Sequence, residues 1–176
     1  SRRKQFVTLQ ITCWDYAMNA LPFSQSLNTV TADTLESLAL VFLVPEEDAP
    51  RSSGKTIRAG VTFTGRFNGA LEISVSSALL AELAENMLGL GESIDLDLQK
   101  DAVKEFANVI CGNILPTIGG AEEIFLVGTP SVLEGPAVVR EDSWALAGKT
   151  KLFTEEGTMT VTLYTDPSAL EASEAA

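Results

Sequence analysis

Hydrophobic residues recur every three or four positions in three segments, which is the spacing of amphipathic helices. The first segment begins at Ser24, which can serve as an N-cap; its periodic positions are Leu27, Val30, Thr31, Leu35 and Leu38. The second spans about 79–88 and ends at Gly89. The third spans about 99–115 and is ended by Pro116 and the Gly119-Gly120 pair. The pattern therefore predicts a few helices, two of them long.

Between these helices the hydrophobic period changes to two, which is typical of half-buried strands. Residues 57–63 alternate apolar and polar side chains, and residues 71–75 return after a glycine-bounded turn at 65–69. The apolar run 41–44 is interpreted as a short buried strand, followed by a polar loop. Further strands are predicted at 124–127, 132–133, 144–153 and 158–164.

The order of these elements predicts an α/β fold of the α+β type, with a mostly antiparallel sheet packed by helices. A chain of 176 residues is long enough for one hydrophobic core. We expect an N-terminal extension at 1–22, a single domain at 23–166 and a mobile acidic tail at 167–176.

Charge narrows the range of partners. The net charge is −12, and the only basic cluster is Arg2-Arg3-Lys4. An acidic surface repels phosphate backbones, which argues against a nucleic-acid partner, although acidity also serves solubility. The longest apolar run, 38–44, is far shorter than the roughly 20 residues of a membrane helix. With no signal peptide recognised, we expect a cytoplasmic protein that does not insert into membranes.

The chain has no histidine, which excludes histidine-based acid–base catalysis and histidine metal ligands. Its two cysteines, Cys13 and Cys111, match no metal-binding or redox spacing and are interpreted as reduced packing residues. Phosphate-binding loops and nucleophile elbows are missing as well. Asp95 and Asp97 resemble the paired aspartates of metal-dependent aspartyl-phosphate enzymes. However, they precede a helix rather than follow a buried strand, and Asp97 is the better candidate for its N-cap.

A second, polar stripe runs along the helix predicted at 99–115. Asp101, Glu105, Asn108 and Gly112 fall at positions i, i+4, i+7 and i+11, so they share one face opposite the apolar stripe. Glu105 and Asn108 therefore project side by side from adjacent turns. Such a stripe alone is most often an ordinary solvated helix face.

This segment resembles the signature helix of the CheC/CheX phosphatase family. In the family pattern an acidic residue or serine is followed after three residues by Glu and after two more by Asn, with a Pro about 22 residues further on. Asp101, Glu105 and Asn108 match it, and Pro130 follows after 21 intervening residues. The strand at 55–65, the return strand from Phe67 and the helix end at 87–89 are similar to the family too. The resemblance covers about 24–166.

The resemblance implies a phosphatase that removes the aspartyl phosphate of a CheY-type chemotaxis response regulator. Asn108 would orient the attacking water, a task that needs an amide but no tuned pKa. Glu105 would pair with the receiver's lysine, while Asp101, Gly112 and Pro130 would contact the partner. The receiver supplies the magnesium, so no cofactor or metal of this chain's own is expected.

The family also comes in one-site and two-site forms. CheC-type members carry two Glu-x-x-Asn helices, whereas CheX-type members keep one and dimerise. Here Glu36 is followed three positions later by Ala39, which predicts the one-site type. We therefore expect a homodimer joined through an unpaired strand edge at 57–63 or 158–164. The alternative is a monomer whose edges are covered by residues 1–22.

Two other functions stay open at this point. The chain could be a non-catalytic, CheC-like binding module of the chemotaxis or flagellar switch apparatus. It could instead be a metal-dependent hydrolase that uses Asp95 and Asp97.

Overall fold

The computed structural model describes residues 21–51, 54–89 and 94–174. Its sheet has the strand order β3-β1-β2-β6-β5, with β4 also paired to β1, and all pairings are antiparallel. The strands are β1 (Thr56–Thr64), β2 (Gly69–Ser76), β3 (Leu126–Val127), β4 (Ser131–Val132), β5 (Ala145–Phe153) and β6 (Thr158–Thr165). The helices are α2 (Ser24–Ala39), α3 (Ser77–Leu88), α4 (Leu96–Gly119) and α5 (Pro167–Glu174), with a short 3-10 turn η1 (Glu46–Asp48).

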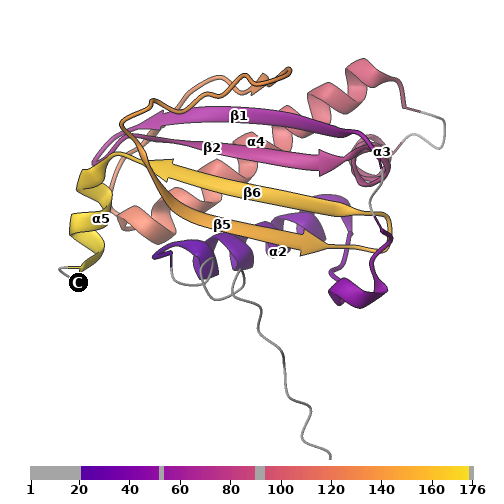
Figure 1. Ribbon diagram of the computed structural model, residues 1–176, viewed down its shortest axis with the longest axis horizontal. Helices are drawn as coiled ribbons and strands as arrows, with labels where there is room; N and C mark the ends of the chain where they lie inside the picture. Colours follow the sequence, from indigo (N-terminus) through magenta and orange to yellow (C-terminus); the bar gives the residue numbers. More distant parts are fainter. Residues whose placement is uncertain (1–20, 52–53, 90–93, 175–176) are drawn as a thin grey trace, which may run out of the picture.

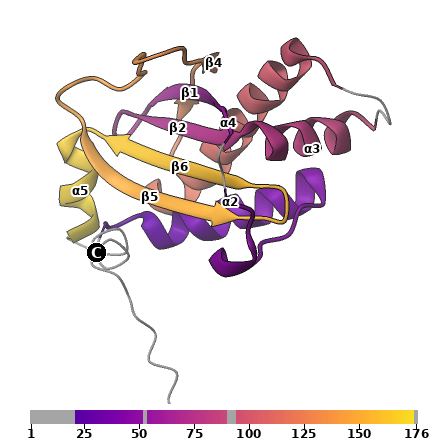
Figure 2. The same cartoon turned by 45° about the vertical axis from the view of Figure 1, so that its right-hand side comes forward.

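Helices α2 and α4 cover one face of the sheet (Figure 1), and α3 packs against both near the end of β2 (Figure 2). The alternating residues of β1, β2 and β6 point into this interface and form the core with the apolar stripes of the helices. The predicted α+β class and antiparallel sheet are therefore confirmed.

The predicted strand at 41–44 is wrong. Leu40 ends α2 in the left-handed conformation, with φ of 54°, and turns the chain away from the helix. Val41 is buried, but Phe42 is 62% exposed, and the hydrogen bond from the Val44 amide to the Phe153 carbonyl is the segment's one backbone link to β5 in the described residues.

Both predicted helix caps are also wrong. Phe23 occupies the N-cap position of α2, and the Ser24 hydroxyl instead accepts a hydrogen bond from the Lys149 amide at 3.0 Å. In α4 the cap is Asp95, whose Oδ1 accepts from the Leu98 amide at 2.9 Å, so Asp97 falls in the first turn. Because Asp95 rather than Asp97 is the cap, α4 begins at Leu96, about one turn before the predicted start at residue 99.

The C-terminal segment differs from the expected mobile tail. Residues Pro167–Glu174 form α5, in which Ala169 is buried and Leu170 packs on the core. Asp166 precedes this helix, and its carboxylate accepts hydrogen bonds from the amide and hydroxyl of Ser168 and from the Asn68 amide. Partial burial alone would raise the pKa of Asp166, but these hydrogen bonds hold it below the ordinary value. Ala169 and Leu170 therefore hold this acidic helix against the rest of the protein.

The sheet edges also differ from those expected. The strands that contain 57–63 and 158–164 are β1 and β6, and both are paired on each side. The edge of β5 is partly occupied, because the Phe23 amide donates to the Ala147 carbonyl at 3.1 Å. The other edge consists of the short strands β3 and β4. Residues 1–20, which hold Cys13 and most of the predicted extension, lie outside the described part.

Three aromatic rings fix the C-terminal end of α4 to the sheet. Phe125 makes edge-to-face contacts with Phe63 and Phe67, at ring-centroid distances of 6.0 and 5.1 Å. Gly119, the last residue of α4, lies against the Phe125 ring: a Cβ there would come within 2.5 Å of Cε2. Gly112 of the same helix faces open space, with no atom within 4 Å of such a Cβ.

We expect Gly119→Ala to lower the free energy of unfolding by about 1–3 kcal/mol, because the Phe125 ring is held on two sides and cannot yield. Gly112→Ala is the matched control and should raise stability by about 0.5–1 kcal/mol, since alanine favours a helix interior over glycine. Urea unfolding curves compare both variants with the parent. Equal effects of the two substitutions would contradict this packing.

Glu82 of α3 lies near three other carboxylates, on α3 and on the turn between β5 and β6. Burial raises the pKa of Glu82 above its ordinary value of 4.5, and the charges of Glu156, Glu155 and Glu85 raise it further. The folded state therefore binds a proton at Glu82 more tightly than the unfolded chain does. This contribution favours folding at low pH and is lost as pH rises through the folded-state pKa.

Glu82→Gln should therefore stabilise the protein at neutral pH, where the parent carries the unfavourable charge, and the gain should vanish below pH 4.5. Thermal unfolding at several pH values measures it, with Glu85→Gln as a control expected to give a smaller gain. A gain that persists unchanged at low pH would show that charge is not its cause.

Candidate functional site

Helix α4 carries the predicted site on the face that points away from the core. Its apolar stripe is fully buried and consists of Val103, Phe106, Ala107, Ile110 and Ile114. On the opposite face Asp101, Glu105 and Gly112 are exposed and Asn108 is half-buried. The structure thus brings these four predicted residues together on one exposed ridge, as the helical spacing indicated.

The ridge residues differ in how they are engaged. Asp101 forms an ion pair with Lys104, one turn on, at 2.7 Å. Within the described part of the chain, Glu105 and Asn108 form no side-chain hydrogen bond or ion pair. Their carboxylate and amide groups are therefore available to a partner and to water.

Gly112 adds a second kind of acceptor to the ridge. Residue 116, four positions on, is a proline inside the helix and has no N–H to donate. The Gly112 carbonyl therefore lacks its usual i+4 donor, and no side chain at Gly112 shields the surface around it. A partner's backbone can approach closely at this point.

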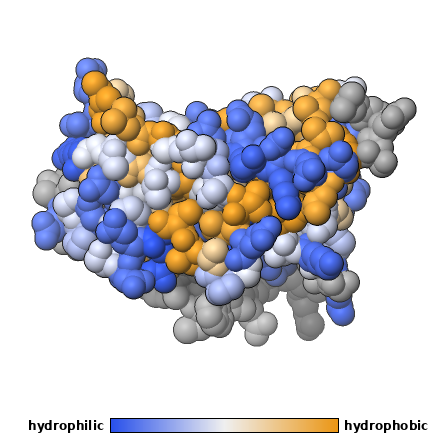
Figure 3. All heavy atoms as spheres, turned by 90° about the horizontal axis from the view of Figure 1, so that it is seen from above, coloured by the Kyte–Doolittle hydropathy of each residue, from blue (hydrophilic) through white to orange (hydrophobic). Residues whose placement is uncertain are grey.

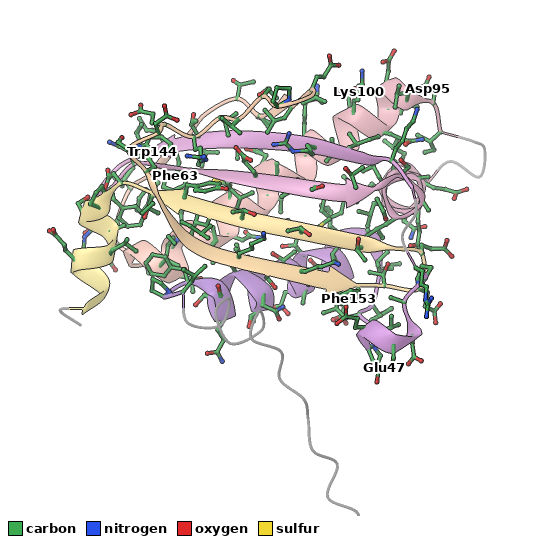
Figure 4. All side chains as sticks on the ribbon, viewed as in Figure 1. Glu47, Phe63, Asp95, Lys100, Trp144 and Phe153 are labelled. Atoms are coloured by element: carbon green, nitrogen blue, oxygen red, sulfur yellow. The ribbon has the colours of Figure 1, made fainter. Side chains whose placement is uncertain are left out.

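Pro130 lies between β3 and β4, on a segment that runs back along α4. One end of this segment is fixed where Phe125 touches Gly119, and the other where Lys100 Nζ lies 3.8 Å from Glu134 Oε1 (Lys100 is labelled in Figure 4). A helix advances about 1.5 Å per residue and an extended chain about 3.3 Å. The helical stretch 100–119 and the extended stretch 125–134 therefore have similar lengths, about 30 Å each. Pro130 is near the middle of the extended stretch and Asn108 is near the middle of the helical one, so by this comparison the two residues lie at the same level along α4.

A groove borders the other side of the ridge, and its residues were not predicted from the sequence. It has a volume of about 300 Å³ and is lined by Met87, Leu88, Leu98, Asp101, Ala102 and Glu105. Leu88 is 46% exposed although it is the last residue of α3. The available signal was that Leu88 and Leu98 are apolar residues outside the main buried stripe.

The competing catalytic groups are poorly placed. Asp95 caps α4 through its carboxylate and Asp97 is exposed in the first turn, so neither lies at the end of a buried strand. The described ranges contain no group of three or more Asp, Glu or Cys residues arranged to hold a metal ion. Burial raises the pKa of the Cys111 thiol to about 12, which keeps it protonated and unreactive.

Helix α2 lacks a second site of the same kind. Glu36 is exposed, but Ala39, three positions on, is buried, and its carbonyl accepts a hydrogen bond from the Asn86 amide of α3 at 2.9 Å. No helix in the described residues is long and apolar enough to span a bilayer.

The structure is similar to several solved chemotaxis proteins. CheX from Desulfovibrio desulfuricans matches with a TM-score of 0.64 and 22% identity, over 81% of this chain and 97% of that one. CheX in the CheX–CheY–BeF₃–Mg²⁺ complex from Borrelia burgdorferi matches with a TM-score of 0.56 and 17% identity, over 81% and 96%. FliY from Thermotoga maritima matches with a TM-score of 0.55 and 14% identity, over 90% and 91%. At these identities the matches establish the fold.

A comparison with curated protein sequences gives no significant match. The sequence profile of the family described as "Chemotaxis phosphatase CheX" matches residues 57–147, which include all but the first residue of β1 and the whole of β2, α3, α4, β3 and β4. This match spans just over half of the chain and contains the ridge on α4. The chain therefore belongs to the CheX family of the CheC/CheX chemotaxis phosphatases.

Proposed function

We propose that this protein dephosphorylates the aspartyl phosphate of a CheY-type response regulator, with Glu105 and Asn108 inserted into the receiver's active site. The observation that carries the proposal is that Glu105 is exposed and Asn108 is half-buried on adjacent turns of α4, and neither side chain has a hydrogen-bond or ion-pair partner among the described residues. The CheX–CheY complex from Borrelia burgdorferi, which has the same fold, supports a receiver as the partner.

Asn108 is proposed to orient the attacking water. Its side-chain oxygen can accept a hydrogen bond from the water, and its N–H₂ group can donate one to a phosphoryl oxygen. Phosphoryl transfer depends mainly on positioning and on stabilising charge. A non-titrating amide on a rigid helix therefore suffices, and no histidine is needed.

Glu105 is proposed to fix the register of the complex. An unpaired carboxylate one turn from Asn108 can accept a charge-assisted hydrogen bond from the lysine of the receiver's active site. Asp101 is already paired with Lys104 and would contact the receiver only at the edge. Gly112 and Pro130 would admit the receiver's backbone on either side of Asn108. Magnesium would enter with the receiver, as part of the substrate.

The alternative of a non-catalytic binding module rests on the fold shared with FliY. That fold alone does not distinguish a scaffold from an enzyme. A scaffold needs the surface of α4 but has no need for an amide at position 108. The alternative hydrolase needs Asp95 as a metal ligand, whereas its side chain is engaged in capping α4.

We expect Asn108→Ala to slow the accelerated dephosphorylation by about a hundredfold or more, because the water loses its orienting group. Glu105→Ala should instead weaken receiver binding by about tenfold or more, through the lost charge-assisted hydrogen bond. Single-turnover hydrolysis of phosphorylated receiver, measured against protein concentration, separates the two effects. The matched control is Asn113→Ala on another face of α4.

Asp95→Asn should leave turnover unchanged, because asparagine caps a helix as well as aspartate does. A large loss there, with Asn108→Ala as active as the parent, would favour the metal-dependent hydrolase and reject the role given to Asn108.

We further propose that the working unit is a homodimer joined at the β3–β4 edge. Ile124 and Leu126 beside this edge are 81% and 71% exposed. Figure 3 views the molecule from above, which is the side on which the β3–β4 edge lies in Figure 1. Apolar surface lies among hydrophilic groups on this side. A second copy would cover these side chains and extend the sheet.

Sedimentation at micromolar concentration should therefore give a species of about twice the 18.7 kDa chain mass. Replacing Ile124 and Leu126 together by lysine should shift it to the monomer, since charge at an apolar interface is costly. The Leu146→Lys variant, at the opposite edge, is the control. A parent that sediments as a single 18.7 kDa species would reject the dimer.

A further inference from the structure

The groove beside the ridge combines an apolar floor with acidic walls. Met87 and Leu88 come from the last turn of α3, and Leu98 and Ala102 come from the first turns of α4. Asp101 and Glu105 stand at its rim and are also part of the ridge. The groove and the ridge are therefore one continuous surface, with Asp101 and Glu105 as their common members.

We propose that this groove binds an apolar side chain of the phosphorylated receiver, next to a basic residue of the same partner. The inference rests on the proposed function and adds a second anchor point to it. A molecule bound at Asn108 and Glu105 would lie next to the groove, because Glu105 forms part of its wall.

The charges around the groove favour a basic partner. Among the described residues, both charged groups of its lining, Asp101 and Glu105, are carboxylates, and of the two only Asp101 is paired with a cation of this chain, Lys104. A positive group on the partner would complement Glu105, whereas an acidic segment would be repelled. An acidic segment of a second copy would be repelled from this groove in the same way.

The size and lining of the groove favour one large apolar side chain. A volume of about 300 Å³ accommodates a leucine, methionine or aromatic side chain. Ala102, 6% exposed, is small enough to leave depth at the floor, and the flexible thioether of Met87 can adapt to the shape of the occupant. A central apolar anchor flanked by charged pairs is a common arrangement of binding hot spots.

The test compares Leu88→Gln with Val138→Gln. Both positions carry apolar side chains of similar exposure, 46% and 49%, but Val138 lies on the loop after β4, away from the groove. The probe is the CheY-type receiver of the same organism, activated with beryllofluoride and Mg²⁺. Calorimetry gives its Kd, and single-turnover hydrolysis of the phosphorylated receiver gives the rate at saturation.

Leu88→Gln should raise Kd by about tenfold, since it removes apolar surface that the partner would cover, and should leave the saturating rate within about twofold of the parent. Val138→Gln should change neither value. A Leu88→Gln protein that is folded and binds like the parent overturns the groove and leaves the roles of Glu105 and Asn108 standing. A parent that does not bind the activated receiver at all overturns both proposals.

Discussion

The burial of one face of α4 against the sheet is the contact on which the site depends. Its apolar side chains Val103, Phe106, Ile110 and Ile114 are completely inaccessible to solvent. Burial of a side chain of this size contributes about 1.5–3 kcal/mol, so the helix cannot rotate about its axis without a large loss of stability. Because the helical period is fixed, holding this face inward holds the opposite face outward. Glu105 and Asn108 are directed away from the protein for the same reason that the core residues are directed into it.

The proposed site depends more on the fixed position of its side chains on α4 than on a metal ion or a group with a shifted pKa. The described residues offer no metal cluster, and Cys111 is buried with a pKa of about 12. The chemistry proposed for this surface asks for an amide held at a fixed place, and a displacement of about 1 Å can cost a hundredfold in rate. The ring contacts of Phe125 at one end of α4 and the Asp95 cap at the other both serve that requirement, although neither touches the ridge.

Periodicity predicted the features that depend on local sequence. The helices, the hairpin of β1 and β2 and the exposed ridge all follow from spacings within about 20 residues. Apart from the helix caps, the main errors concern contacts between distant segments. Residues 41–44 look like a strand but have only one backbone bond to β5, and the strands expected at sheet edges proved to be interior because β6 pairs with β2. The groove was missed for a different reason: its residues are close in sequence, but it forms only through the angle at which the end of α3 packs against the start of α4. Glu105 and Asn108 as catalytic residues stay a prediction, because their exposure and spacing were expected but their chemistry is untested.

The division of charge along the ridge bears on the roles proposed for its residues. The net charge of −12 attracts any basic partner at long range and distinguishes poorly between partners. Discrimination has to come from groups at contact distance. An exposed ion pair such as Asp101–Lys104 contributes only about 0–1 kcal/mol to stability, yet it neutralises the carboxylate nearest the start of the ridge. Glu105 is then the carboxylate of the ridge whose charge is not offset by a neighbour among the described residues. A partner's lysine that approaches α4 therefore gains most at Glu105, and from there Asn108 is one helical turn away.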